Sequence, residues 1–202
     1  VDLILQFCIS GEEVKVFDPA CGAGTFLVRA YQLKKLMNQR LPHEKILDTL
    51  WGNDIAKFPA HLSTINLAIN DLSVDRNYPK IIQKDFFDLL SSEEKGFQLP
   101  DDIRKVFLKT MAGRELEVVH PRWFDAIVGN PPYTRQEEIA EVSGEPTYKE
   151  RLIAKALQYG DKTVASISRR AGIYTYFFTH GTKFLRNGGR FGFIVSNAWL
   201  DE

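Results

Sequence analysis

The chain alternates between short apolar runs and longer segments in which apolar residues recur at helical spacing. Runs that stay apolar without alternating, such as Phe124–Gly129, are typical of strands that are covered on both faces. Strands that alternate with helices indicate an α/β fold with a mostly parallel sheet and helices on both faces. The predicted strands are Lys15–Asp18, Thr49–Asp54, Ile81–Gln83, Phe124–Gly129 and Arg190–Val195.

The first half of the chain is predicted to contain three helices. One begins at about Thr25, and a short additional helical segment is expected near 43–48. The third runs to about Leu72, where apolar residues follow the 3.6-residue period of an amphipathic helix. Its buried face is predicted to consist of Phe58, Leu62, Ile65, Ile69 and Leu72.

The second half is predicted to be less regular. Polar residues dominate 91–122, which we interpret as an insertion around one helix at Ile103–Met111. Glycine, proline and polar residues also mark 134–172 as mobile loops around a helix near 147–159. A further helix is predicted over Ile173–Leu185, followed by a glycine turn and the last strand.

Composition indicates an ordinary globular domain of 202 residues, with 44% hydrophobic and 26% charged residues and no net charge. No apolar run approaches the roughly 20 residues of a membrane-spanning helix, and no signal peptide is evident, so a cytoplasmic location is expected. The two cysteines and four histidines lack metal-ligand spacing, so no metal is expected. The equal counts of acidic and basic residues give no bulk attraction to nucleic acid.

Both ends of the sequence suggest a piece of a longer polypeptide. The chain opens on Val1 inside an apolar stretch and closes directly after a predicted core strand. We therefore interpret 1–202 as a single domain that is truncated at both ends.

A glycine-containing turn follows the first predicted strand. Gly22 and Gly24 would let the backbone approach a ligand closely, and the helix that follows offers its N-terminus to a carboxylate. Leu27 stands where a dinucleotide fingerprint has its third glycine, which favours a nucleoside with an amino-acid tail over a pyrophosphate. The alternative is a plain tight turn.

Asp54 and Asp85 are candidate nucleoside-binding carboxylates because each follows a predicted strand. Asp54 could accept hydrogen bonds from both ribose hydroxyls. Asp85 could accept from an adenine amino group while the neighbouring Phe86 covers the ring. For both residues the alternative is a carboxylate that caps the next helix.

The most specific motif is Asn130-Pro131-Pro132-Tyr133 after the fourth strand. The prolines fix the backbone and provide no N–H donors, which leaves carbonyl acceptors. An Asn amide oxygen and a proline carbonyl can accept both hydrogens of an exocyclic amine and so polarise its nitrogen towards an electrophile. Tyr133 offers a flat face for a nucleobase. The alternative is a proline-rich strand exit with a packed tyrosine.

Together these motifs resemble the S-adenosylmethionine-dependent DNA adenine-N6 methyltransferases of the gamma-type motif order, as found in type I and type IIG restriction-modification systems. The resemblance implies the Rossmann-like fold of class I methyltransferases, with S-adenosylmethionine as the cofactor. It also implies that 1–202 is the catalytic core and that the last strands of the sheet are missing from this piece. The matching segments are Asp18–Phe26, Asp85–Phe87, Asn130–Tyr133 and Phe191–Leu200.

The resemblance also implies roles for individual residues. The methionine end of the cofactor would be held around Asp18, Ala20, Gly22 and Gly24, its ribose by Asp54, and its adenine by Asp85 and Phe86, with Phe177 packed on the adenine. The catalytic group would be Asn130, Pro131, Pro132 and Tyr133, acting on an adenine flipped out of the duplex.

The implied partners are double-stranded DNA and a target-recognition domain or specificity subunit that lies outside these residues. Two alternatives stay open. The chain could methylate a protein glutamine or an RNA adenine, or it could be a non-catalytic subunit that binds cofactor or DNA.

Overall fold

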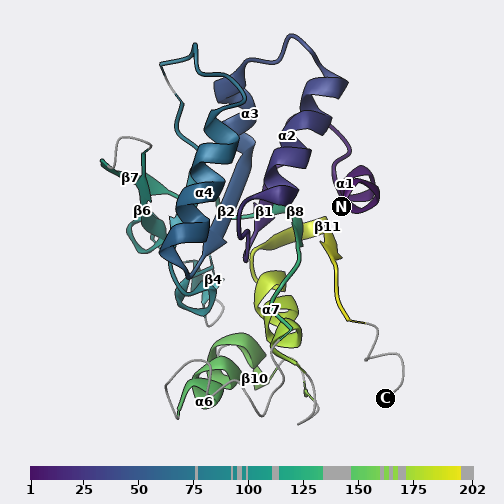
Figure 1. Ribbon diagram of the computed structural model, residues 1–202. Coiled ribbons are helices and arrows are strands. Elements are labelled where there is room, and N and C mark those ends of the chain that lie inside the picture. The colour runs from purple at the N-terminus through teal and green to yellow at the C-terminus, as the bar shows by residue number, and fades with distance from the viewer. Residues whose placement is uncertain are drawn as a thin grey trace.

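A central mixed sheet organises the computed structural model (Figure 1). The part of the chain that the structure describes covers 1–75, 77–91, 93–94, 97–98, 100–110, 114–133, 147–159, 162–163, 166–167 and 172–196.

Within these residues, seven strands form the sheet in the order β11-β8-β1-β2-β3-β6-β7. The strands β11, β8, β1, β2 and β3 are parallel, whereas β6 and β7 are antiparallel and extend the sheet beyond β3. The bounds are β1 Val16–Asp18, β2 Leu50–Asp54, β3 Lys80–Gln83, β6 Lys105–Lys109, β7 Glu115–Val119, β8 Phe124–Gly129 and β11 Leu185–Phe193. Short strands outside the sheet are β4 Glu93–Glu94, β5 Phe97–Gln98, β9 Gln158–Tyr159 and β10 Lys162–Thr163.

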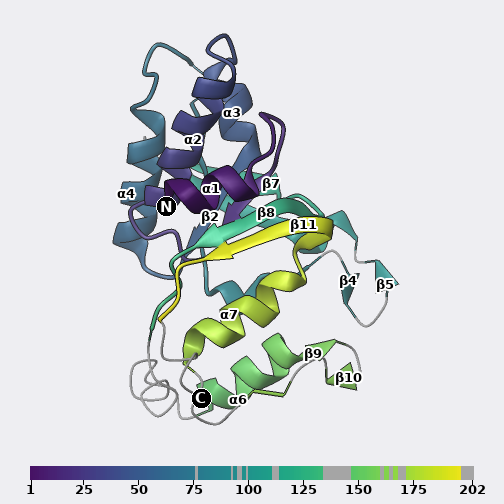
Figure 2. The ribbon, with the colours of Figure 1, turned by 90° about the vertical axis from the view of Figure 1, so that its right-hand side faces the viewer.

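Helices cover both faces of the sheet, as Figure 2 shows. One face carries α1 Asp2–Cys8, α2 Thr25–Met37, α3 His43–Thr49 and α4 Lys57–Ala68. The other face carries α6 Tyr148–Leu152, a π-helical turn at Ile153–Leu157 and α7 Ile173–Thr182. Short 3-10 turns lie at Phe86–Asp88 and Asp101–Arg104.

Neighbouring residues of each central strand point into different cores. Val16 packs into the cluster under α1–α4, whereas Phe17 packs into the aromatic cluster under α7. Ala126 and Ile127 divide in the same way on β8. This two-sided burial explains why the strands are continuously apolar, and the predicted α/β fold with a mostly parallel sheet is confirmed.

The predicted buried face of α4 is wrong for three of its five residues, whereas Leu62 and Ile65 are half-buried. Phe58 is 76% exposed, and Ile69 and Leu72 lie beyond the end of the helix and are also exposed. The buried face consists instead of Leu67 and four smaller side chains, which allow the helix to pack closely. The buried residues of α4 are Ala60, Ser63, Thr64, Leu67 and Ala68.

The predicted helix at Ile103–Met111 is also wrong, since β6 occupies Lys105–Lys109. Val106 and Leu108 are buried while Phe107 between them is 59% exposed, which is the two-residue period of a strand. The backbone of β6 forms its hydrogen bonds with β7, a pairing that the sequence did not predict. This part of 91–122 therefore extends the main sheet.

The last strand is longer than predicted. β11 begins at Leu185 and includes the glycine turn, where the pairing with β8 shifts register between Leu185 and Arg190. Gly188 has φ of +72° within this bulge. Much of the loop region expected at 134–172 and residues 197–200 of the last matching segment lie outside the described residues.

Candidate active site

A cavity of about 280 Å³ lies at the carboxyl ends of β1 and β8. The chain passes from β1 through β2 to β3 on one side, and β8 then lies on the other side of β1. Ligands of α/β sheets bind at such a switch point. The lining residues are Val1, Asp18, Ala20, Cys21, Gly22, Ala23, Thr25, Phe26, Asn130 and Ile194.

The glycine loop forms one wall of this cavity. Gly22 and Gly24 have φ of +54° and +86°, a region that favours glycine. A Cβ at Gly24 would lie 2.5 Å from the Ser63 Oγ of α4, so close packing excludes a side chain there as well. A Cβ at Gly22 would meet nothing within 4 Å, which leaves this part of the loop open to a ligand.

Asp18 ends β1 at the base of the cavity and is only 1% exposed. Its Oδ1 accepts a hydrogen bond from the Ala20 N–H at 3.1 Å. Burial raises the pKa of the Asp18 carboxyl to about 8, and the nearby Asp54 contributes in the same direction. A Cβ at Gly129 would lie 2.7 Å from the Asp18 Oδ1, so this glycine leaves room for the carboxylate.

Asp54 holds the glycine loop against the end of β2. Its Oδ2 accepts from the Gly22 N–H at 2.9 Å, and its Oδ1 accepts from the Ala56 N–H at 2.8 Å ahead of α4. Asp54 does not cap α4, because the N-cap residue is Ala56 and no side chain caps this helix end, so the capping alternative is wrong. Ile55, which the sequence reasoning missed, is 64% exposed directly beside it. Nothing in the local sequence marked Ile55 as exposed, because an isoleucine after a strand is usually expected to be buried.

Asp85 follows β3. The residue before it, Lys84, donates its N–H to the Asp54 carbonyl at 3.2 Å, so the ends of β2 and β3 lie side by side. The Oδ1 of Asp85 accepts from the Phe87 N–H at 3.0 Å, as a cap would. Its Oδ2 accepts from the Tyr148 hydroxyl at 3.1 Å and from an Arg151 Nη at 2.7 Å.

Phe86 and Phe177 are brought together within the aromatic core. Their rings stack with centroids 5.3 Å apart and are 2% and 7% exposed. Phe86 also packs against Phe17 and Phe184. Neither ring lines the cavity at the switch point, and their predicted contact with an adenine ring stays a prediction.

The Asn130–Tyr133 motif follows β8, and its first residue, Asn130, lines the cavity. Asn130 and Pro132 are exposed, and Pro131 is buried. The Tyr133 hydroxyl donates to the Asn130 Oδ1 and lies 3.1 Å from the Ile194 carbonyl oxygen. The hydroxyl thus holds a ring that is 46% exposed beside the amide that is predicted to receive the target amine.

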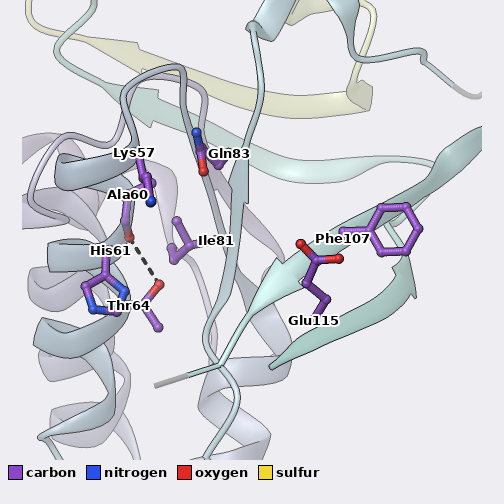
Figure 3. A pocket seen from close by; sticks show the side chains of 8 residues that line it. All are labelled: Lys57, Ala60, His61, Thr64, Ile81, Gln83, Phe107 and Glu115. Carbon is purple, nitrogen blue, oxygen red and sulfur yellow. Dashed lines mark hydrogen bonds between the residues drawn. The ribbon is translucent and has the colours of Figure 1, made fainter. Parts of the chain in front are cut away.

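A second cavity, of about 250 Å³, lies between α4 and the β6–β7 hairpin. Figure 3 shows Lys57, His61 and Thr64 of α4 on one side and Phe107 and Glu115 on the other, with β3 between them. Its lining residues are Lys57, Ala60, His61, Thr64, Ile81, Gln83, Phe107 and Glu115. The predicted site residues do not line this cavity.

The described residues contain neither a metal-binding cluster nor a membrane-spanning helix. Across the described ranges, histidine, cysteine and acidic side chains form no group of three or more that could hold a metal ion. Among the same residues, no helix has the length and apolar character needed to cross a membrane.

The sheet topology and the glycine-loop cavity define a class I S-adenosylmethionine-dependent methyltransferase fold. The chain belongs to the Eco57I restriction-modification methylase family, whose model matches residues 48–202. This family and fold imply S-adenosylmethionine as the cofactor. The residues fit its amino-acid end, because an open glycine loop and a buried carboxylate face one cavity.

Curated relatives include the type II methyltransferase M.BanIII of Aneurinibacillus aneurinilyticus, which is 24% identical over 193 residues. That match covers 95% of this chain and 27% of the relative. The type II methyltransferase M.XhoI of Xanthomonas vasicola is 38% identical over 79 residues, which cover 39% of this chain and 12% of the relative. The chain thus spans about a quarter or less of the length of these relatives.

Solved structures share the fold at low sequence identity. The type IIG restriction endonuclease BpuSI matches with a TM-score of 0.62 and 19% identity, covering 98% of this chain and 18% of that one. The DrdV–DNA complex matches with a TM-score of 0.58 and 20% identity, covering 100% of this chain and 19% of that one.

Proposed function

We propose that the protein transfers a methyl group from S-adenosylmethionine to N6 of adenine in DNA, as the modifying activity of a restriction-modification system. The observation that carries this proposal is the shared cavity of the Asp18–Gly24 loop and Asn130. One motif would hold the cofactor and the other the amine, and both face the same space. Proximity of this kind can supply much of the rate enhancement of a direct transfer.

The roles of the chain's own residues follow from the chemistry of an exocyclic amine. When bound, the cofactor supplies an electrophilic methyl group on a sulfonium. The Asn130 Oδ1 and the Pro131 carbonyl would accept hydrogen bonds from the two N–H groups of the amine, which would direct the nitrogen lone pair to the methyl group. One amine proton would leave to solvent, because the methylated amine keeps a single N–H, and the transfer would leave a neutral thioether in place of the sulfonium. The exposed ring of Tyr133 stacks on the target base and holds its plane against these acceptors.

Support for a DNA substrate comes from the family and from relatives. The matching family is one of restriction-modification methylases, and one structural neighbour, DrdV, is described as a complex with DNA. An adenine amine is paired inside a duplex, so the target base must be flipped out before it can reach Asn130. A target-recognition domain or specificity subunit would select the sequence.

Nucleoside mass spectrometry tests substrate and chemistry together. DNA is analysed from cells that express the protein, its Tyr133→Ala variant, or a Tyr78→Ala control. Tyr78 is a similarly exposed tyrosine outside the motif, at 41% against 46% exposure. We expect N6-methyladenine with the unchanged protein and the control, and its loss with Tyr133→Ala.

In cells that also express the target-recognition domain or specificity subunit, the absence of N6-methyladenine from all three DNA samples would contradict the DNA proposal. Methyl transfer to RNA or to a protein glutamine would then be measured with radiolabelled cofactor. Cofactor binding without any transfer would favour a non-catalytic subunit.

A further inference from the structure

Arg151 and Tyr148 of α6 both donate hydrogen bonds to one carboxylate oxygen of Asp85. The proposed function assigns this carboxylate to the adenine of the cofactor. An Arg151 Nη lies 2.7 Å from the Asp85 Oδ2, and the Tyr148 hydroxyl lies 3.1 Å from the same atom. The Arg151 guanidinium also lies 4.8 Å above the centroid of the Tyr148 ring and 3.9 Å from the Asp88 carboxylate. The contact is therefore a connected cluster, defined here as the Asp85 clamp.

The clamp leaves one acceptor position on Asp85. A carboxylate has about four lone-pair sites, and the described residues fill two on Oδ2 and one on Oδ1, where the Phe87 N–H donates. The side chain is only 11% exposed, so it has little room to rotate. Under the proposed function, the remaining acceptor site on Oδ1 is the one left for the amino group of the cofactor's adenine.

Nothing in the Asp85 motif itself would hold the second oxygen. The cap to Phe87 is local, within two residues, whereas Tyr148 and Arg151 are 63 and 66 positions away. Leu152, Ala156 and Leu157 pack into the aromatic core and fix α6 and the turn after it beside Phe86. The core thus presents the arginine and tyrosine to Asp85 as a preformed pair.

We propose that Arg151 and Tyr148 are positioning residues that orient Asp85 to select the adenine amino group of the cofactor. The inference rests on the proposed function, because it assumes that Asp85 addresses the adenine. A charged, doubly hydrogen-bonded Oδ2 keeps the free site of Oδ1 in one direction. An untethered carboxylate would turn and accept less selectively.

The test measures selectivity rather than affinity alone. Calorimetry gives the Kd of S-adenosylhomocysteine and of S-inosylhomocysteine, in which a carbonyl replaces the amino group. The unchanged protein is expected to prefer the adenosyl compound by about tenfold or more, the scale of a hydrogen bond to a charged group. Arg151→Gln and Tyr148→Phe are expected to reduce that preference by about three- to tenfold.

Lys149→Gln is the matched control, since it removes a positive charge from the same helix without touching the clamp. We expect it to keep the preference of the unchanged protein. The thermal midpoint of each variant is measured alongside, and Tyr148→Phe, which retains the buried ring, guards against a folding defect of Arg151→Gln.

The outcomes separate the inference from the function on which it rests. If both clamp variants keep the preference, or lose affinity for both compounds equally, the positioning role is wrong while the cofactor assignment stands. If the unchanged protein binds neither compound, or binds both equally, the proposed role of Asp85 fails and the inference fails with it.

Discussion

Asn130 is the residue on which the proposed chemistry depends most directly. Its amide oxygen stands at the cavity that the glycine loop also lines and already accepts from the Tyr133 hydroxyl. A group that acts on the target amine contributes to transfer and little to cofactor affinity.

We therefore expect Asn130→Ala to lower the rate of methyl transfer by at least about 100-fold. In other enzymes, removal of one oriented polar group lowers kcat by roughly 10²–10³. The Kd for S-adenosylmethionine should change by less than about threefold. Equal losses of transfer and of cofactor binding would contradict the assignment. Tyr133→Phe, which keeps the ring and removes the hydroxyl, serves as the control and should retain more activity than Tyr133→Ala.

The raised pKa of the Asp18 carboxyl predicts that the stability of the protein depends on pH. This pKa is raised from 3.8 to about 8, mainly by burial, so the folded protein holds a proton that the unfolded chain releases above pH 4. The free energy of unfolding contributed by this group therefore falls as pH rises from about 4 to about 8. In the absence of cofactor, Asp18→Asn should gain stability relative to the unchanged protein across this interval.

Chemical denaturation at intervals from pH 5 to pH 9 measures this difference. A stability difference between Asp18→Asn and the unchanged protein that stays constant with pH would show that Asp18 is ionised in the folded state throughout.

At the scale of elements, the β6–β7 hairpin can be tested through two neighbouring side chains. Leu108 is 2% exposed and Phe107 is 59% exposed, because successive strand residues face opposite sides of the sheet. Leu108→Ala should lower the free energy of unfolding by about 2–4 kcal/mol. Phe107→Ala should cost less than about 1 kcal/mol. Comparable losses at both positions would fit the helix that the sequence predicted better than a strand.

The element boundaries illustrate what local patterns can predict. Phe124–Gly129 was predicted at its observed bounds, and the helix starting at Thr25 and the short helix near 43–48 were also confirmed. The pattern failed for α4 because close packing selected a face of small residues over the more apolar one. It failed for β6 because pairing with β7 is a non-local contact.

On the scale of the whole molecule, the His180 ring contacts three rings of the aromatic core. Its ring lies 4.7 Å from Phe86, 5.3 Å from Phe87 and 5.4 Å from Phe184, measured between centroids. Its Nδ1 donates to the Lys155 carbonyl at 3.2 Å. Burial, with Lys183 nearby, lowers the pKa of His180 from 6.5 to about 3.

The folded state therefore keeps His180 neutral, whereas the unfolded chain takes up a proton below pH 6.5. The stability that this group contributes is fully present above that pH and is lost as pH falls towards 3. His180→Phe removes the titration and keeps an aromatic ring, so its stability relative to the unchanged protein should increase between pH 6.5 and 4. Guanidinium denaturation at a series of pH values tests this, and parallel curves for the two proteins would contradict it.

The sequence by itself determined the α/β class, most strands and the polar clusters at their carboxyl ends, because continuous apolar runs and glycine or proline motifs act locally. It also identified the Asp18–Gly24 loop and Asn130 as parts of one site, since parallel strands end at the same edge of a sheet. The structure brings these two groups to a single cavity.

Only the tertiary structure decided how the remaining candidates are used. Asp85 meets Arg151 and Tyr148 from a segment more than 60 residues away, and Phe86 and Phe177 stack within the core. The antiparallel pair β6–β7 and the buried face of α4 were decided in the same way. All of these contacts depend on which segments, far apart in the sequence, pack against each other. The spacing of side chains along one segment does not reveal which other segment it will contact.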